Sequence, residues 1–271
     1  MSILEYLYKT KSGRVLLRPL VSKPVSDLSG FVLDSSVSKL LIGPFVKNNK
    51  INTSEYRLDG INSFNDFFCR RIKPGRRVVD MEKTSLVAPC DGLLSVNKIS
   101  SGSILSVKQS KFTVSRLLRD RRLAASFNDG YALVFRLCVD NYHRYIYFDS
   151  GKKYSNRKVS GIYHTVRPVA LEEYPVFIEN SREYCVIDSE NFGRCVQMEV
   201  GAMLVGRIVN KDKRTKKVRR GAEKGHFEYG GSTIILLVPK NKVNLRDDIL
   251  KRLNSNHEIP VKMGEVIGYK I

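Results

Sequence analysis

The sequence predicts a mainly β protein of the α+β class, with a sandwich or barrel-like core and short N-terminal amphipathic helices. Large apolar residues stand at every second position of Tyr131–Val139, with Ala, Val, Arg and Cys between them, which is the period of a β-strand. Short apolar segments recur from about residue 84, and Gly, Asn, Asp and Ser separate them. Long helical periodicity is absent from this part, apart from one short helix within Leu245–Leu253. A sheet-based core follows from these observations.

The first 50 residues show a different pattern and predict three short helices. The first has its apolar face at Ile3–Tyr8 and should stop at Pro19. Pro24 suits the first turn of the second helix. Residue 34 or 35, an Asp or a Ser, could cap a third helix that ends at Gly43-Pro44. These helices either pack on the core or lie on a lipid surface with their basic residues at the headgroups.

Seven segments are expected to form strands of the β-rich part. Each is short, apolar and bounded by turn residues. The segments are Leu93–Ile99, Tyr131–Val139, Val176–Ile178, Tyr184–Ile187, Val196–Val200, Met203–Val209 and Ile234–Val238.

The charge balance indicates an anionic partner. Lys and Arg number 47 against 27 Asp and Glu, which gives a net charge of +20. Nucleic acid, an acidic membrane surface or an acidic substrate would suit such a surplus. The densest run is Lys211–Arg220, which is either a solvated hairpin or an anion-facing loop. No aromatic residue interrupts this run, which argues against single-stranded nucleic acid as the partner.

The cysteines and histidines argue against a metal site and against a disulfide framework. The five cysteines are widely spaced and form no CxxC pair, and no two histidines lie three or four residues apart. A reducing compartment fits this usage. No signal peptide and no run of 18 apolar residues is evident, so a membrane partner would be bound peripherally.

Gly230-Gly231-Ser232-Thr233 is the most informative tetrapeptide for chemistry. It stands immediately before the apolar segment Ile234–Val238. A glycine bulge at the start of a strand would explain it. A strained peptide bond that the following serine attacks would explain it equally well. The other segments of the chain distinguish these two interpretations.

Six segments, in this order, resemble the phosphatidylserine decarboxylases, pyruvoyl-dependent enzymes that make phosphatidylethanolamine. Each segment is weakly diagnostic by itself, but together they are specific and span roughly residues 60–240. They are Phe64–Arg76, Ala88–Gly92, Asp140–Tyr145, Tyr163–Pro168, Glu199–Gly206 and Lys224–Thr233.

The resemblance implies a proenzyme that cuts itself between Gly231 and Ser232. The Ser232 hydroxyl attacks the Gly231 carbonyl, and the new N-terminus becomes a covalent pyruvoyl group. That group forms a Schiff base with phosphatidylserine and accepts the electrons left by departing CO2. The two fragments are expected to stay associated.

The resemblance also assigns roles to side chains. Asp91 matches the carboxylate of the family's Asp–His–Ser relay, and His143 matches the proton donor for decarboxylation. Many members carry a second histidine three residues later, where this chain has Ile146. Either His143 serves both stages, which we favour, or His164 acts as the self-cleavage base. His164 also fits a purely structural role.

The resemblance divides the chain into residues 1–55, a helical membrane-associating segment, and residues 56–271, a β-rich catalytic domain. It implies a phosphatidylserine substrate, an anionic membrane surface as partner, and a peripheral position on the cytoplasmic face. No nucleic-acid partner and no metal is expected. The alternatives are a pyruvoyl enzyme for a soluble amino acid, a relative that no longer processes itself, and a basic β-rich lipid- or nucleic-acid-binding protein without turnover.

Overall fold

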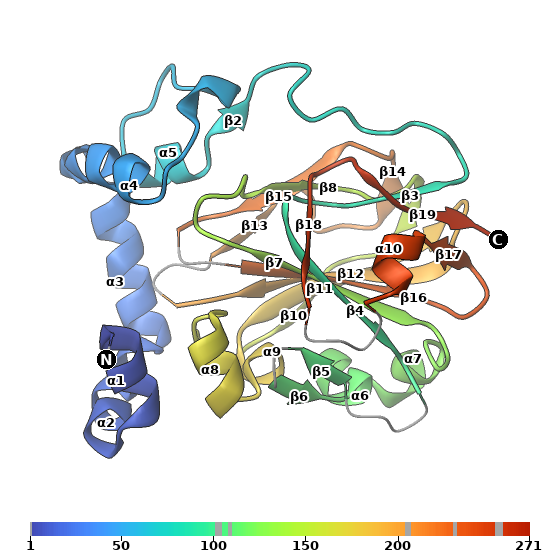
Figure 1. Ribbon diagram of the computed structural model, residues 1–271, viewed down its shortest axis with the longest axis horizontal. Coiled ribbons are helices and arrows are strands. Elements are labelled where there is room, and N and C mark those ends of the chain that lie inside the picture. Colours follow the sequence, from blue (N-terminus) through green and yellow to red (C-terminus); the bar gives the residue numbers. More distant parts are fainter. Residues whose placement is uncertain (1, 101–104, 108–109, 204–206, 230–231, 253–256) are drawn as a thin grey trace.

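The structure is a computed structural model that describes residues 2–100, 105–107, 110–203, 207–229, 232–252 and 257–271. Antiparallel sheets form its body, and a run of short helices precedes them (Figure 1). The mainly β, α+β prediction with short N-terminal helices is thereby confirmed. The first strand starts at Tyr56, directly after the proposed boundary at residue 55, although the division into domains stays a prediction.

The N-terminal region contains more helices than the three predicted. Thr10 separates the first two, because its side chain accepts a hydrogen bond from the Gly13 amide and starts a new helix. Pro24 lies in the first turn of a helix, as predicted, although this helix is the third and not the second. Gly43-Pro44 does not stop a helix; it lies in the first turn of α4, where a missing N–H costs nothing. The elements are α1 (Ile3–Lys9), α2 (Lys11–Leu20), α3 (Lys23–Asp34), η1 (Ser36–Leu41), α4 (Ile42–Asn48) and η2 (Thr53–Glu55).

A nine-stranded antiparallel sheet forms the centre of the body, in the order β14-β9-β11-β12-β16-β7-β4-β18, with β10 also paired to β11. Its strands are β4 (Gly92–Lys98), β7 (Tyr131–Leu137), β9 (Gly151–Lys153), β10 (Arg157–Val159), β11 (Arg182–Ser189), β12 (Gly193–Gly201), β14 (Lys216–Val218), β16 (Ser232–Val238) and β18 (Ile259–Val261).

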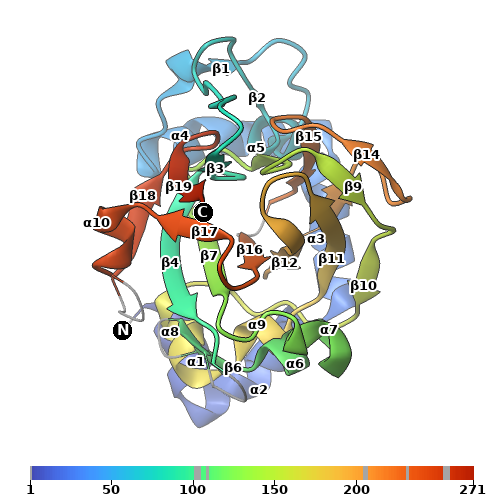
Figure 2. The ribbon, with the colours of Figure 1, turned by 90° about the vertical axis from the view of Figure 1, so that its right-hand side faces the viewer.

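Smaller sheets flank the central sheet, and Figure 2 shows β3, β17 and β19 gathered near the C-terminus. One three-stranded sheet runs β13-β15-β8 and another runs β17-β19-β3. The strands are β8 (Arg144–Ile146), β13 (Ile208–Asn210), β15 (Glu223–Phe227), β3 (Ser85–Val87), β17 (Val243–Leu245) and β19 (Val266–Lys270). Two pairs complete the set: β1 (Tyr56–Arg57) with β2 (Arg71–Ile72), and β5 (Leu105–Val107) with β6 (Ser110–Phe112).

Both faces of the central sheet are covered at β16, so this strand is buried on both sides. Ile235 and Leu237 of β16 face a cluster built with the helices, including Leu7 of α1. Ile234 and Leu236 face the opposite cluster, which includes Tyr145 of β8 and Phe227 of β15. Alternation places the Ser232 side chain on this second face, toward the sheet that contains β8 and β15.

The remaining helices are short. They are α5 (Phe64–Phe68), α6 (Val114–Leu118), α7 (Arg121–Ala125), α8 (Pro168–Glu173), α9 (Val176–Glu179) and α10 (Asp247–Leu250). The helix expected within Leu245–Leu253 is therefore present as α10.

Two expected strands differ from the structure. Val176–Ile178 lies in α9, because Pro175 starts a helical turn whose three apolar residues are all buried and so show no periodicity. Of the strand expected at Met203–Val209, residues 204–206 lie outside the described part of the chain. The strand there is β13, which begins at Ile208.

No helix in the described ranges is both long and apolar enough to cross a bilayer. Within those same ranges, no group of three or more His, Cys, Asp or Glu side chains is arranged to hold a metal ion.

Candidate active site

Ser232 is the first residue of β16 and is fully buried. Register pairs it with Leu137 at the end of β7 and with Gly201 at the end of β12. Its Oγ has no hydrogen-bond partner in the described part of the chain. A buried hydroxyl without a partner is costly and therefore points to function. Gly230 and Gly231, the other part of the predicted cleavage site, lie outside the described residues.

His143 lies in the connection between β7 and β8, completely buried, with its ring 4.0 Å from that of Phe68 between centroids. Its Nδ1 is 3.0 Å from the carbonyl oxygen of Asn141. A carbonyl only accepts, so Nδ1 carries the hydrogen and Nε2 carries the lone pair. Nε2 has no hydrogen-bond partner among the described residues. Burial and the nearby charge of Arg70 lower the pKa of His143 to about 3, which keeps the ring neutral.

The connection that carries His143 is fixed to β15, the strand that leads toward Ser232. The Phe227 amide donates to the His143 carbonyl oxygen at 2.9 Å. The Ser232 side chain is on the sheet face that contacts this same small sheet. The fold thus brings a neutral imidazole and an unpartnered serine hydroxyl to one side of the central sheet.

Arg70, two residues after the end of α5, also binds this connection. Its Nη2 donates to the carbonyl oxygens of Asp140 and Asn141, each at 3.3 Å. The guanidinium lies 4.2 Å from the centre of the Tyr56 ring, and only 2% of the residue is exposed. Asn141 therefore accepts hydrogen bonds from both Arg70 and His143, which fixes the imidazole tautomer.

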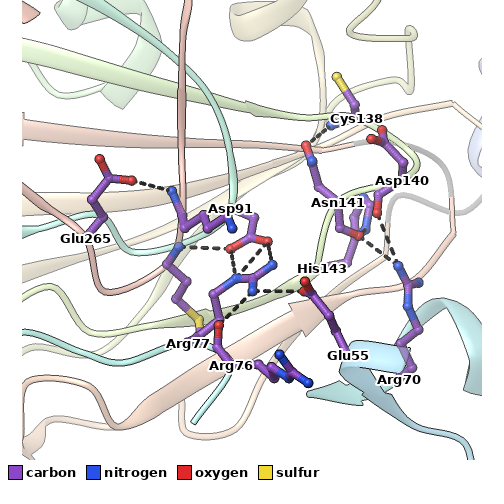
Figure 3. A network of polar contacts seen from close by, with 12 residues as sticks. Glu55, Arg70, Arg76, Arg77, Asp91, Cys138, Asp140, Asn141, His143 and Glu265 are labelled. Carbon is purple, nitrogen blue, oxygen red and sulfur yellow. Dashed lines mark hydrogen bonds and ion pairs between the residues drawn. The ribbon is translucent and has the colours of Figure 1, made fainter. Parts of the chain in front are cut away.

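Asp91 precedes β4 and is bound on both carboxylate oxygens (Figure 3). Arg77 Nε donates to Oδ1 at 2.8 Å, and Arg77 Nη2 donates to Oδ2 at 2.6 Å. The Met263 amide also donates to Oδ1, at 2.9 Å. In the described part of the chain no hydrogen bond joins Asp91 to His143 or His164. The described residues therefore show no hydrogen-bonded relay through Asp91, and the role of Asp91 stays a prediction.

Close approach of β4 to β7 positions Asp91. A Cβ on Gly92 would lie 2.9 Å from the Arg136 carbonyl oxygen, so a side chain there would push the strands apart. Ile146 lies near the same segment, since its amide donates to the Pro89 carbonyl oxygen at 2.9 Å. Its side chain packs in one apolar cluster with Met263. The position where many family members carry a second histidine is thus filled by an apolar residue beside the Asp91 segment.

His164 is surrounded by groups that hold the N-terminal helices to the body. Its Nδ1 lies 3.1 Å from the Tyr8 hydroxyl, its Nε2 lies 3.4 Å from Glu179, and Tyr174 stacks on the ring. Burial lowers the pKa of His164 to about 4. Both ring nitrogens face partners other than Ser232, so the geometry favours the structural interpretation of this residue.

Sequence reasoning missed three residues of this site. Arg70 and His226 lie within segments that carry the resemblance, but a single basic residue in a sequence does not show whether its side chain will be part of a site. Arg77 lies one residue beyond such a segment. The His226 Nδ1 is buried with no hydrogen-bond partner among the described residues. Burial and the charge of Arg144 lower the pKa of His226 to about 4.

A cavity of about 420 Å³ opens beside the start of β16. Leu137, the strand partner of Ser232, and Tyr229, three residues before it, both line this cavity. The other lining residues come from α1, from β7 and its C-terminal extension, from the segment before α8 and its first residue, and from the segment after β12. They are Leu4, Arg136, Cys138, Val139, Thr165, Val166, Arg167, Pro168 and Met203.

These features define a chain equipped for chemistry at an internal, buried serine. The family described as "Phosphatidylserine decarboxylase" matches residues 64–269. Phosphatidylserine decarboxylase proenzyme 2 of Clostridium acetobutylicum is 40% identical over 266 residues, which cover 98% of this chain and 91% of that protein. The proenzyme of Ruminiclostridium cellulolyticum is also 40% identical, over 98% of this chain and 90% of its own length. The chain therefore belongs to the phosphatidylserine decarboxylase family.

Proposed function

We propose that this chain is a self-processing proenzyme that decarboxylates phosphatidylserine to phosphatidylethanolamine and CO2. The observation that carries the proposal is Ser232, which is buried at the start of β16 without a side-chain partner among the described residues, next to Leu137 at the wall of a cavity. Membership of the family supports both the reaction and the proenzyme state. The serine is located where one side chain can serve first as nucleophile and afterwards as the source of a prosthetic group.

Self-cleavage starts when Ser232 Oγ attacks the Gly231 carbonyl carbon. The peptide becomes an ester and the Ser232 nitrogen becomes a free amine. β-Elimination then breaks the Cβ–Oγ bond, leaving a carboxylate on Gly231 and dehydroalanine at position 232. One water replaces the nitrogen, ammonia leaves, and a pyruvoyl group remains. The first step needs a base for the hydroxyl proton, and we assign it to Nε2 of His143, whose lone pair has no partner among the described residues.

The surroundings of position 232 fit a pyruvoyl group made from Ser232 itself. Among the described residues nothing binds its Oγ, so loss of this oxygen to the Gly231 carboxylate, which leaves the former Cβ as the methyl group, breaks no hydrogen bond with them. When formed, the group supplies a carbonyl that takes the substrate amine and accepts electrons as CO2 leaves. His143 is assigned the return of a proton to the substrate carbon. An anionic substrate nearby would favour protonation of its imidazole, opposing the effect of Arg70.

Asp91 is retained in the proposal as a group that self-cleavage needs. Its contacts with Arg77 and the Met263 amide support a positioning role, in which it holds together segments on either side of the site. Arg77 also contacts Glu55 at 3.1 Å, so this network continues into the segment after the N-terminal helices.

The two fragments are expected to stay associated, because residues 232–271 are woven into two sheets. β16 lies between β12 and β7 at the centre of the large sheet. β18 pairs with β4, and β19 pairs with β3. Separation would expose the fully buried strand Ser232–Val238. Cutting before β16 therefore leaves a complex that only unfolding would dissociate.

The N-terminal helices are proposed to bind the membrane surface that carries the substrate, on its cytoplasmic face. Leu28, Phe31 and Val32 of α3 share a helical face, and Phe31 is 77% exposed. Further exposed apolar residues on α1, α2 and η1 continue this N-terminal apolar surface. They are Ile3, Val15, Leu16, Val37, Leu40 and Leu41. Exposed apolar residues in such number suit insertion among lipid headgroups.

The basic run Lys211–Arg220 contributes less to membrane binding than its sequence suggests. Lys216 pairs with Asp212 at 2.8 Å, and Arg220 is buried against Asp149. Figure 1 shows β14, which lies within this run, on the side of the body away from α1–α3. A flat bilayer against the N-terminal helices would leave the run at a distance, where it adds long-range attraction.

The direct test is the intact mass of the purified chain. Self-processing predicts two pieces, residues 1–231 and residues 232–271, the smaller with a pyruvoyl N-terminus. Ser232→Ala should remain one piece, and wild-type protein should release phosphatidylethanolamine from phosphatidylserine vesicles. A single full-length mass after long incubation at neutral pH would contradict the proposal.

A further inference from the structure

The cavity beside β16 contains two guanidinium groups that differ in their surroundings. Arg136 projects from β7, and Arg167 lies immediately before α8. Arg136 donates to both oxygens of Glu258, at 2.9 and 2.6 Å, and both side chains are nearly buried. Its charge is therefore already paired within the protein.

Arg167 is exposed, and its guanidinium has no hydrogen bond or ion pair with any residue in the described ranges. Its charge is close enough to Tyr229 to oppose the burial that raises the pKa of that phenol. Tyr229 stands three residues before Ser232 and lines the same cavity. Among the described residues that line this cavity, Arg167 is thus a cation without a protein partner, and Leu137, the strand partner of Ser232, lines the same cavity.

Phosphatidylserine presents two anions to such a cation, a carboxylate and a phosphodiester. The carboxylate loses its charge as CO2 forms, so a cation bound to it would stabilise the starting state and slow the reaction. The phosphodiester keeps its charge throughout, and binding it anchors substrate without that penalty. We infer that Arg167 binds the phosphodiester of the phospholipid, an inference that rests on the proposed function.

The apolar part of the cavity fits the same orientation of the lipid. Leu4, Val166 and Met203 line it together with Leu137. Leu4 belongs to α1, one of the helices that carry the N-terminal apolar surface. A phospholipid held at its phosphate by Arg167 would direct its glycerol and acyl chains toward these side chains. Its serine headgroup would then extend toward position 232.

The test measures binding and turnover separately, using soluble dihexanoyl phosphatidylserine and dihexanoyl phosphatidylethanolamine. Binding is measured by calorimetry on the uncut Ser232→Ala chain, whose cavity is already formed. Arg167→Gln in that background should weaken binding of both lipids equally, by about tenfold. In the processing chain, Arg167→Gln should raise KM by a similar factor with kcat little changed, and Arg167→Lys should recover part of the loss. Arg157→Gln, which removes an exposed guanidinium from a surface ion pair on β10, is the control.

Three results would overturn the inference. Unchanged affinity and KM in Arg167→Gln would show that the residue does not contact the lipid. Weaker binding of phosphatidylserine alone would place the carboxylate on Arg167 instead. Inorganic phosphate that binds as tightly as either lipid would mark an adventitious phosphate site. If the wild-type chain neither cut itself nor released phosphatidylethanolamine, the proposed function would fail, while the calorimetry would still report on Arg167.

Discussion

Replacement of Asp91 by Asn separates two roles for this carboxylate. Asp91 and Arg77 have side chains only 7% and 6% exposed, so their pairing takes place largely out of water. Arg77 donates to both carboxylate oxygens, and the Met263 amide donates to one of them. An Asn can keep one oxygen as acceptor for Arg77 and Met263 but removes the negative charge.

The expected costs follow from these contacts. Removing one partner of a buried ion pair costs about 3–5 kcal/mol, because it leaves an uncompensated buried charge. The stability cost of Asp91→Ala should lie in the lower part of that range, because Glu55 still contacts Arg77 and partly compensates its charge. Asp91→Asn leaves fewer groups unpaired and should cost about 1–3 kcal/mol.

The assay uses two forms of each variant. Unfolding by urea is measured in the Ser232→Ala background, where the chain stays intact, and self-cleavage is followed by gel in the processing background. Asp149→Asn is a matched control, because Asp149 is also buried and paired with an arginine, Arg220. It should lose comparable stability and still cut itself at the normal rate.

Because Asp91 contacts Arg77 and Met263 rather than an imidazole, the Asn variant should still cut itself, within about tenfold of the wild-type rate. Asp91→Ala, which removes every contact, should cut far more slowly. A folded but uncut Asp91→Asn chain would refute this reasoning. It would show that the charge itself acts in a relay.

Four further predictions concern the histidines and the N-terminal apolar surface. His143→Ala should remain uncut because it loses the unpaired Nε2, whereas His164→Ala should cut; the opposite pair of results on gels would exchange the assignments. Since the pKa of His143 is about 3, the self-cleavage rate should be flat from pH 5 to 8, and a fall centred near pH 6.5 would contradict a buried base. The pKa values of His143, His164 and His226 are lower in the folded chain than in the unfolded chain. As the pH falls, the unfolded chain therefore takes up protons at a higher pH than the folded chain does. Urea stability of the Ser232→Ala chain should therefore fall as pH drops from about 6.5 toward 4, and a rise would contradict the burial of these rings. The double variant Phe31→Glu with Leu40→Glu should no longer float with phosphatidylserine liposomes. The control is Val78→Glu, which changes an exposed apolar residue outside the N-terminal helices and should still float. Unchanged flotation of the double variant would show that the N-terminal apolar surface does not bind the membrane.

Local patterns in the sequence were sufficient to predict an element where one local interaction decides its conformation. Alternation at Tyr131–Val139 predicted β7, and Pro24 predicted the first turn of α3. The order of six short segments predicted the family, and with it Ser232 and His143 as candidates. The pattern failed at Val176–Ile178, where burial on every side removes periodicity. It failed again at Gly43-Pro44, since a Pro in a first turn and a Pro after a helix look alike in sequence.

The environment of each candidate was decided only by the tertiary structure. Nothing local to Asp91 shows that Arg77 and the amide of Met263 occupy both of its oxygens, because Met263 is distant in sequence and arrives through β18. His143 and His164 are each a single histidine in an aromatic context. Folding buries one with an unpaired nitrogen and surrounds the other with Tyr8, Tyr174 and Glu179. Hydrogen bonding and desolvation depend on which distant segments meet in the fold. The residue types in the sequence therefore determined the candidate chemistry. The packing of the sheets determined which residues are placed to perform it.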